Sequence, residues 1–231
     1  MNTEMGQNRR VKLKTGLLNI IFPPVCVFCM RYSANPVCEK CKDSVVTFGS
    51  RAATEGTLYI GERLYCYGKY MGILRERFID YKFGKTLWLG RYFGKMMYME
   101  FKNALADRRP DLVAYVPVSK KRFRERGFDQ SFEMATALAE GLRVPCKPLL
   151  ICRNIGGRQS GLNRNQRFSQ VDGRFGVSEE IRDAKGKRIL LVDDIFTTGA
   201  TLNACTQLLL NEGVSVVDGM VFATGRTDLE A

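Results

Sequence analysis

Histidine is absent from the chain of 231 residues. This absence excludes a histidine general base, and it limits any zinc site to cysteine and carboxylate ligands. Long apolar runs are also missing: the longest one near the start, LLNIIF, ends at Pro23, whereas a membrane span needs about 18 residues. The same run is shorter than the apolar core of a signal peptide, although basic residues precede it. We therefore expect a cytoplasmic protein with no membrane span.

Acidic residues are scarce relative to basic ones: 24 Asp and Glu stand against 36 Lys and Arg, a net charge of +12. A surface this positive concentrates polyanions, so it favours a phosphate-rich partner. Much of the charge lies in Lys120–Gly127 and Arg153–Arg174, where Phe123, Phe128 and Phe168 are interleaved. These segments could contact nucleic acid, or they could be solvated helix faces beside core phenylalanines; both interpretations stay open.

Four of the eight cysteines form two C-x-x-C pairs, at Cys26, Cys29, Cys38 and Cys41. Two such pairs can enclose one ion with four thiolates, as structural zinc sites do, and this leaves no open position for catalysis. A redox dithiol is the alternative, but that motif is normally single and lies within a strand–helix–strand unit. The other cysteines are far apart in the sequence and are predicted to be small buried side chains in a reducing compartment: Cys66, Cys146, Cys152 and Cys205.

Strand and helix signals alternate along the chain, with no internal repeat. Apolar spacing predicts helices from about 71 onward and over 89–106, 128–142 and 201–211, and strands near 64–70, 111–118, 147–152, 174–177, 188–192 and 214–223. This order predicts an α/β fold with a mainly parallel sheet flanked by helices. Small and polar residues predict a linker over 44–57. We expect two domains: an N-terminal arm with a four-cysteine zinc knuckle over 1–50, and the α/β domain over 51–231.

The segment LLVDDIFTTGATL, residues 190–202, places Asp193 and Asp194 directly after a buried strand. Ligands of parallel sheets bind outside the carboxyl ends of the strands, so both acids are expected at a ligand site. A spare acid beside a helix cap is the simpler alternative. Two carboxylates suit the vicinal hydroxyls of a ribose, with a divalent metal offsetting their charge.

The loop that follows these acids consists almost wholly of small hydroxyl-bearing or flexible residues: Thr197, Thr198, Gly199, Ala200 and Thr201. Glycine and alanine let the backbone approach a ligand closely, and the threonine hydroxyls add donors to the free N–H groups of a helix start. Such a loop is suited to one phosphate. The acids and the loop together predict a site for a phosphorylated ribose.

This acidic pair with TTGAT resembles the phosphoribosyl pyrophosphate (PRPP) motif of type I phosphoribosyltransferases. Together with DLVAYVPVSKKRFRERGFDQS, GRQSGLNRNQR and the cysteine pairs, the chain is similar to the ComF family of ComFC-like competence proteins, from Cys26 to Gly225. The resemblance implies a phosphoribosyltransferase-like domain that uses Mg²⁺ and PRPP. It also implies a role with single-stranded DNA in natural transformation, with a competence helicase as a candidate partner.

The resemblance also assigns roles to residues. Asp193 and Asp194 would be the catalytic acids that hold the ribose hydroxyls. The diphosphate loop would be Val118–Lys121, and its contacts would come from Ser119, Lys120, Lys121, Arg122 and Arg126. A hood over the sugar would be Gln159–Arg167, with anion contacts from Arg164 and Arg167. Asp129 replaces the asparagine of the family pattern R-G-F-N-Q, which argues against a direct diphosphate contact there.

Two functions remain open at this point. In the first, the chain acts in DNA uptake, retains PRPP and Mg²⁺ binding, and binds single-stranded DNA through its basic segments, including Arg9–Lys14. In the second, it is an active phosphoribosyltransferase that transfers phosphoribosyl to a nitrogenous acceptor outside DNA uptake. The net charge of +12 favours the first, because a small-molecule transferase needs only a local positive pocket.

Overall fold

The computed structural model describes residues 24–45, 47–48, 52–53, 59–84, 86–153 and 173–226. The chain forms two compact units, Met1–Val45 and Val46–Ala231, and each is described by itself. Among the described helices, none combines the length and the apolar character needed to cross a membrane.

The described part of the smaller unit, residues 24–45, contains a cysteine-bearing loop followed by the short helix α2 (Glu39–Ser44). The loop folds back on itself, because Val25 and Tyr32 form an antiparallel bridge and the Met30 N–H donates to the Cys26 carbonyl. Met30 has a φ of 59°, which turns the chain sharply after Cys29. Within the described residues 24–45, the buried side chains are those of Cys26, Cys41 and a few apolar neighbours, Val27, Phe28 and Val45.

A six-stranded sheet forms the centre of the larger unit, in the order β1-β2-β8-β7-β3-β4. Its strands are β1 (Ala52–Ala53), β2 (Leu64–Lys69), β3 (Leu112–Tyr115), β4 (Cys146–Lys147), β7 (Arg188–Phe196) and β8 (Val216–Thr224). β1 pairs antiparallel with β2, and the other neighbouring pairs are parallel. A separate antiparallel ribbon joins β5 (Leu150–Cys152) to β6 (Phe175–Val177). The prediction of a mainly parallel α/β sheet is confirmed.

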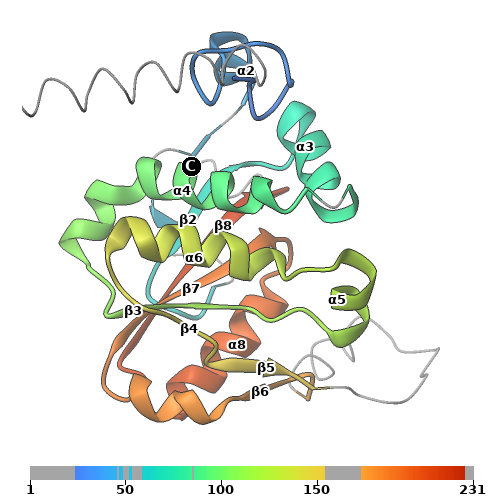
Figure 1. Ribbon diagram of the computed structural model, residues 1–231. Helices are drawn as coiled ribbons and strands as arrows, with labels where there is room; N and C mark the ends of the chain where they lie inside the picture. Colours follow the sequence, from blue (N-terminus) through green and yellow to red (C-terminus); the bar gives the residue numbers. More distant parts are fainter. Residues whose placement is uncertain are drawn as a thin grey trace, which may run out of the picture. The chain divides into compact units, whose positions relative to one another are not determined.

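Helices cover both faces of this sheet (Figure 1). They are α3 (Gly72–Phe83), α4 (Trp88–Asp107), α5 (Lys120–Arg126), α6 (Gln130–Leu142) and α8 (Ala200–Asn211), with a 3₁₀ helix, η1, at Glu179–Ala184. α4 and α6 lie on one face, and α8 lies with the β5–β6 ribbon on the other. α4 and α6 approach so closely at Gly94 that a Cβ there would lie 2.3 Å from the Met134 carbonyl oxygen.

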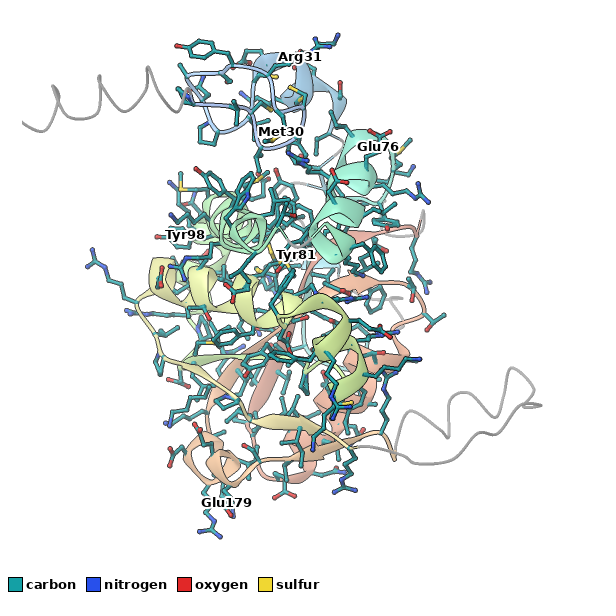
Figure 2. The ribbon with its side chains drawn as sticks, turned by 45° about the vertical axis from the view of Figure 1, so that its right-hand side comes forward. Met30, Arg31, Glu76, Tyr81, Tyr98 and Glu179 are labelled. Atoms are coloured by element: carbon teal, nitrogen blue, oxygen red, sulfur yellow. The ribbon has the colours of Figure 1, made fainter. Side chains whose placement is uncertain are left out.

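Aromatic side chains fill the space between the sheet and helices α3 and α4. The Phe93 and Phe222 rings stack with their centroids 4.1 Å apart, and Phe78 stacks on Phe222 at 5.5 Å. Tyr81 lies in the interior beside them (Figure 2), and its hydroxyl donates to the Gln130 carbonyl at 2.9 Å. These contacts fix α3 against α6, and so they fix the end of α3 near the carboxyl ends of the central strands.

Two sequence-based boundaries differ from the structure. The strand predicted over 188–192 continues to Phe196, so both acids lie within β7 rather than after it. The predicted linker contains β1, because Ala52 and Ala53 extend the sheet edge beside β2. The strand predicted near 64–70 is present as β2, and it is buried on both faces.

Candidate functional site

The chain leaves the parallel central strands β3 and β7 toward opposite edges of the sheet. β3 continues through α5 and α6 to its neighbour β4, whereas β7 continues through α8 to β8 on the other side. Such a reversal of strand order opens a crevice at the carboxyl ends, where ligands of this fold class bind. A cavity of about 230 Å³ lies at this point, between the segments that follow β3 and the end of β7.

The cavity has walls from four parts of the larger unit. It is lined by Lys82, Val116, Pro117, Val118, Arg122, Arg126, Ser131, Arg174, Phe175, Asp193, Asp194, Ile195, Thr197 and Thr201. Four of these side chains are cationic and two are carboxylates. The arrangement therefore suits an anionic ligand that also carries hydroxyl donors.

Asp193 and Asp194 have different environments although they are adjacent. Asp193 is 8% exposed, and its Oδ1 accepts hydrogen bonds from the Ser131 hydroxyl at 3.2 Å and the Asp194 N–H at 2.8 Å. Burial, and then the neighbouring charge of Asp194, raise the pKa of Asp193 well above the usual range of a carboxyl. The side chain of Asp194 is 20% exposed and is the more accessible of the two.

Lys82, which the sequence analysis missed, reaches the acids from α3. Its Nζ lies 2.7 Å from Asp194 Oδ2 and 4.8 Å from the centre of the Phe78 ring. The side chain is 16% exposed, so this cation is held inside the crevice. One signal in the sequence could have found it: Lys82 lies four residues after Phe78 and next to Tyr81, so it shares a side of α3 with buried aromatic residues.

The loop after β7 has the compact form that its composition predicts. Thr197 and Thr201 line the cavity, whereas Thr198 Oγ1 accepts from the Ala200 N–H at 3.4 Å and so shapes the turn. Gly199 has a φ of +78°, and a Cβ there would lie 2.8 Å from Phe196 Cζ. Glycine is therefore required at 199 for two reasons, the left-handed backbone and the closeness of the ring.

The basic helix α5 presents its cations to two sides. Arg122 and Arg126, which are four residues apart, line the cavity at the strand ends. Lys120 and Arg124, also four apart, line a second cavity on the opposite side. Lys121 lines neither cavity; its side chain is 86% exposed and its Nζ lies 4.0 Å from Glu125. Thus Lys120 and Lys121, predicted diphosphate contacts, are not brought to the acids.

Two further residues fix this region. Ser119 is the N-cap of α5, where its hydroxyl accepts from the Arg122 N–H at 3.3 Å. Arg126 Nη1 donates to Gln130 Oε1 at 2.7 Å, its guanidinium carbon lies 5.3 Å from the Phe83 ring centre, and its Nε is buried without a partner among the described residues. Burial lowers the pKa of this guanidinium, which remains cationic.

Asp129 has a structural role that explains its departure from the family pattern. Oδ2 accepts from the Val118 N–H at 2.9 Å, and Oδ1 accepts from the Phe132 N–H at 3.1 Å as the N-cap of α6. Both oxygens are thus used by backbone donors, and Asp129 does not line the cavity beside the acids. An asparagine could supply only one of these acceptors through its oxygen.

Several sequence-predicted contacts lie outside the described residues. These are the hood segment with Arg164 and Arg167, Phe168, and the basic arm Arg9–Lys14. Of the phenylalanines within the basic segments, Phe128 is 7% exposed and belongs to the core, whereas Phe123 is 50% exposed.

The four paired cysteines meet in the smaller unit. The sulfur atoms of Cys26, Cys29, Cys38 and Cys41 all lie within 4.8 Å of one another. Cys29 Sγ and Cys38 Sγ are 3.8 Å apart, which is about the separation of two sulfurs bound at 2.3 Å to one tetrahedral ion. Burial raises the pKa of Cys26, but hydrogen bonds from backbone N–H groups outweigh it and lower that pKa to about 6. Burial, and then hydrogen bonds within the cluster, raise the pKa of Cys41, so the thiols do not all share the lowered pKa of Cys26. The cluster therefore has the geometry of a tetrahedral metal site.

Two other cysteines depart from the expectation of burial. Cys66 and Cys205 are buried, whereas Cys146 and Cys152 are half-buried because they lie on edge strands.

Comparisons with known proteins agree with this architecture. A model of the phosphoribosyl transferase domain matches residues 129–231. The chain is 31% identical over 195 residues to competence protein ComFC of Bacillus subtilis, covering 82% of this chain and 72% of that protein. It is 28% identical over 155 residues to competence protein F of Haemophilus influenzae, covering 65% and 66% of the two chains.

A third relative is named for DNA utilization rather than for competence. The chain is 24% identical over 160 residues to the DNA utilization protein YhgH of Escherichia coli, covering 68% of this chain and 69% of that protein. The cysteine cluster, the phosphoribosyltransferase-like sheet and the match to the Bacillus subtilis protein over most of both chains lead to one conclusion: the chain belongs to the ComF family of competence proteins.

Proposed function

We propose that the larger unit binds PRPP at the cavity between β3 and β7, and that the protein acts on single-stranded DNA during DNA uptake. One observation supports the proposal of PRPP binding: two acids, two threonines and four cations from separate elements line one cavity at the strand-order reversal. Asp194 would accept the ribose hydroxyls, and Thr197 and Thr201 would donate to the 5-phosphate.

The remaining cations of the cavity would hold the diphosphate. Arg122 and Arg126 come from α5, whereas Thr197 and Thr201 come from the segment after β7, so two different elements of the cavity wall can each hold a phosphate of one ligand. Mg²⁺ usually takes one or two carboxylates and completes its shell with substrate phosphates and water. Asp194 fits that requirement better than Asp193 because it is the more exposed acid, although its Oδ1 accepts from the Ile195 N–H at 2.6 Å and its Oδ2 pairs with Lys82. When bound, the ion would offset the charge of the leaving diphosphate.

The second half of the proposal is supported by charge and by the relatives. A net charge of +12 exceeds what one small anionic ligand needs. Two of the relatives are competence proteins and a third is a DNA utilization protein. We further propose that the four cysteines bind one structural Zn²⁺, because tetrahedral thiolate coordination matches their spacing.

Calorimetric titration of the full chain with PRPP, with and without Mg²⁺, tests the sugar-phosphate site. Wild type should bind only with Mg²⁺, and Asp194→Asn should weaken binding at least about tenfold, since it removes a charge-assisted acceptor. Asp107→Asn, an exposed aspartate at the end of α4, is the matched control and should bind as wild type does. Equal affinity of Asp194→Asn and wild type would contradict the assignment.

Turnover is the second candidate function, favoured by the cations that could stabilise a leaving diphosphate. Release of pyrophosphate from PRPP, measured with a panel of nitrogenous acceptors, tests it. Release that depends on an acceptor and is lost in Asp194→Asn would make the protein an active phosphoribosyltransferase. Binding without release would leave PRPP as a ligand of the DNA-uptake role.

A further inference from the structure

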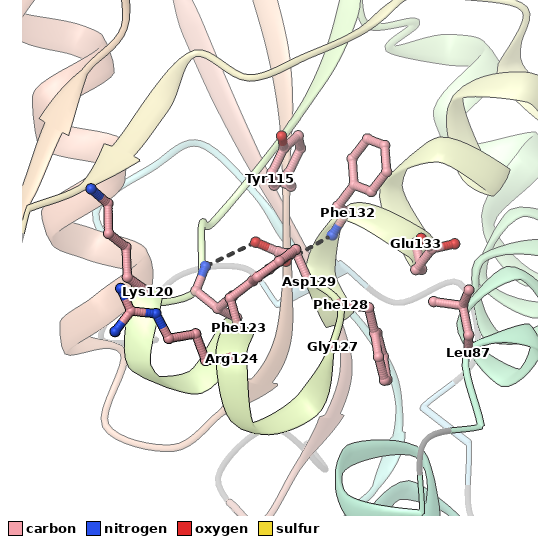
Figure 3. A pocket seen from close by; sticks show the side chains of 11 residues that line it. Leu87, Tyr115, Lys120, Phe123, Arg124, Gly127, Phe128, Asp129, Phe132 and Glu133 are labelled. Atoms are coloured by element: carbon pink, nitrogen blue, oxygen red, sulfur yellow. Dashed lines mark hydrogen bonds between the residues drawn. The ribbon is translucent and has the colours of Figure 1, made fainter.

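A second cavity, of about 590 Å³, lies on the other side of α5 (Figure 3). Its lining is mainly apolar and aromatic, with charged groups at opposite ends: Leu87, Tyr115, Val118, Lys120, Phe123, Arg124, Gly127, Phe128, Asp129, Phe132 and Glu133. Neither the acids of β7 nor the threonine loop contributes to it. The cavity is therefore separate from the proposed sugar-phosphate site, although Val118 borders both.

Two phenylalanines in this lining are exposed rather than packed. Phe123 is 50% exposed and Phe132 is 40% exposed. The Phe132 ring meets the Tyr115 ring edge-on, with the centroids 5.2 Å apart, so the position of Phe132 is fixed. Aromatic surfaces that face an open cavity offer stacking partners to a flat ligand.

The charged groups of the cavity lie at opposite sides. In Figure 3, Lys120 and Arg124 stand on one side and Glu133 on the other. Within the described part of the chain, none of these three side chains has an ion pair. Glu133 is half-buried, and burial raises its pKa while the charge of Arg91 lowers it. A ligand that fits this lining has a flat ring, an anionic end and a hydrogen-bond donor at its far edge.

We propose that this cavity binds an unpaired base of single-stranded DNA, stacked on Phe123 and Phe132, with the adjoining phosphate on Lys120 and Arg124. The Glu133 carboxylate accepts a hydrogen bond from the base edge. This inference rests on the proposed DNA role and gives that role a location. A second copy of the chain is a poor occupant, because it would bring another +12 of charge to a rim that is already basic.

The position of Glu133 predicts which base the cavity prefers. Cytosine presents an amino group to a carboxylate, whereas thymine presents one ring N–H between two carbonyl oxygens that repel it. Oligo(dC) should therefore bind more tightly than oligo(dT) of equal length. Because both are pyrimidines of similar stacking area, the difference isolates the contact with Glu133.

Fluorescence anisotropy of the full chain with labelled 20-mers tests the proposal. Phe123→Ala should weaken DNA binding at least about fivefold, the loss expected for one stacked base. Tyr92→Ala, an aromatic of α4 that is 40% exposed and outside the cavity, is its control and should be neutral. An abasic 20-mer should bind Phe123→Ala and wild type equally, because it has no base to stack.

Two further variants test the ends of the cavity. Glu133→Gln should reduce the preference for oligo(dC) over oligo(dT) at least threefold. The double variant Lys120→Glu, Arg124→Glu should lower the affinity for every oligonucleotide and make that affinity less dependent on salt. Lys102→Glu, on the exposed surface of α4, should change the affinity and its salt dependence much less. Melting temperatures within a few degrees of wild type establish that each variant is folded.

The outcomes separate this proposal from the DNA role itself. If wild type binds none of the oligomers, the DNA role fails and the cavity assignment fails with it. If wild type binds DNA but Phe123→Ala and Glu133→Gln both behave like wild type, only the cavity assignment is overturned. Tighter binding of the matched RNA, or a concentration-dependent dimer that Phe123→Ala dissociates, would replace the DNA base by another occupant.

Discussion

Lys82 Nζ lies 2.7 Å from Asp194 Oδ2, so a cation from α3 neutralises the more accessible acid of the site. The same Nζ is held over the Phe78 ring, which belongs to the aromatic core between α3 and the sheet. The ion pair therefore joins the packing of α3 to the electrostatics of the cavity. The charge of Lys82 also acts on Asp193, whose pKa it lowers against the larger effects of burial and Asp194.

Lys82→Met should weaken Mg²⁺-dependent PRPP binding, because the cavity loses one of its four cations. It should also destabilise the fold by about 1–3 kcal/mol, since a largely buried carboxylate loses its partner. Lys82→Arg keeps the charge and should retain most of the PRPP affinity and most of the stability. Titration calorimetry and urea denaturation measure the two effects. Tighter PRPP binding by Lys82→Met would show instead that the ligand must displace Lys82 from Asp194.

Asp193 should make the stability of the protein fall as pH rises. Its folded-state pKa is raised, so its contribution is fully present below the unfolded pKa of about 3.9 and is lost as pH rises through the folded value. Asp193→Asn keeps an oxygen for the Ser131 hydroxyl and the Asp194 N–H and removes the charge. The variant should therefore gain stability over wild type as pH rises from 5 to about 8.5. Urea midpoints across that range measure the gain, and parallel curves would contradict it.

Gly199→Ala should destabilise the protein and impair PRPP binding. The positive φ costs about 1–2 kcal/mol for an L residue, and the added Cβ would press on the Phe196 ring at 2.8 Å. Gly186→Ala is a matched control, because Gly186 has a φ of +69° with no atom within 4 Å of the added Cβ. Both variants should lose stability through backbone strain, but only Gly199→Ala should lose PRPP affinity. Equal affinities would show that the loop tolerates displacement.

Cys38→Ser should remove most of the metal from the protein. Wild type should carry about one equivalent of Zn²⁺, measured by mass spectrometry of the metal content, because four thiolates complete one tetrahedral shell. Loss of the ion should unfold the segment Cys26–Cys41 and expose it to proteolysis, because binding of a structural metal contributes directly to folding. Cys152→Ser, outside the cluster, is the control and should retain the metal. A metal-free wild type would end the zinc proposal.

The sequence was most informative where function is encoded by neighbouring residues. Asp193, Asp194 and Thr197–Thr201 are contiguous, so strand, acids and loop could be predicted together from one segment. The cysteine pairs were equally visible, because their spacing alone indicates how they wrap an ion. Periodicity also predicted the order of helices and strands, since helices that pack on a sheet keep a regular apolar stripe.

Contributions from distant elements could not be predicted in the same way. Lys82 reaches Asp194 only because aromatic packing holds α3 beside the sheet, and Ser131 meets Asp193 only after α6 docks. The basic run in α5 was visible as charge, but its division between two cavities follows from helical spacing and from what each side of the helix faces. The length of β7 was underestimated because Asp193 and Asp194, a residue type that single-residue preferences disfavour in strands, interrupt its apolar run before Ile195 and Phe196.

The hydrogen bond from the Val118 N–H to Asp129 has a consequence for communication across the molecule. A single peptide forms part of the wall of each cavity, and one carboxylate anchors it to the start of α6. If the two proposed ligands bind at these cavities, a shift of that peptide caused by one ligand would change the wall that the other meets. Thermodynamic reciprocity would then make each ligand alter the affinity of the other by the same factor.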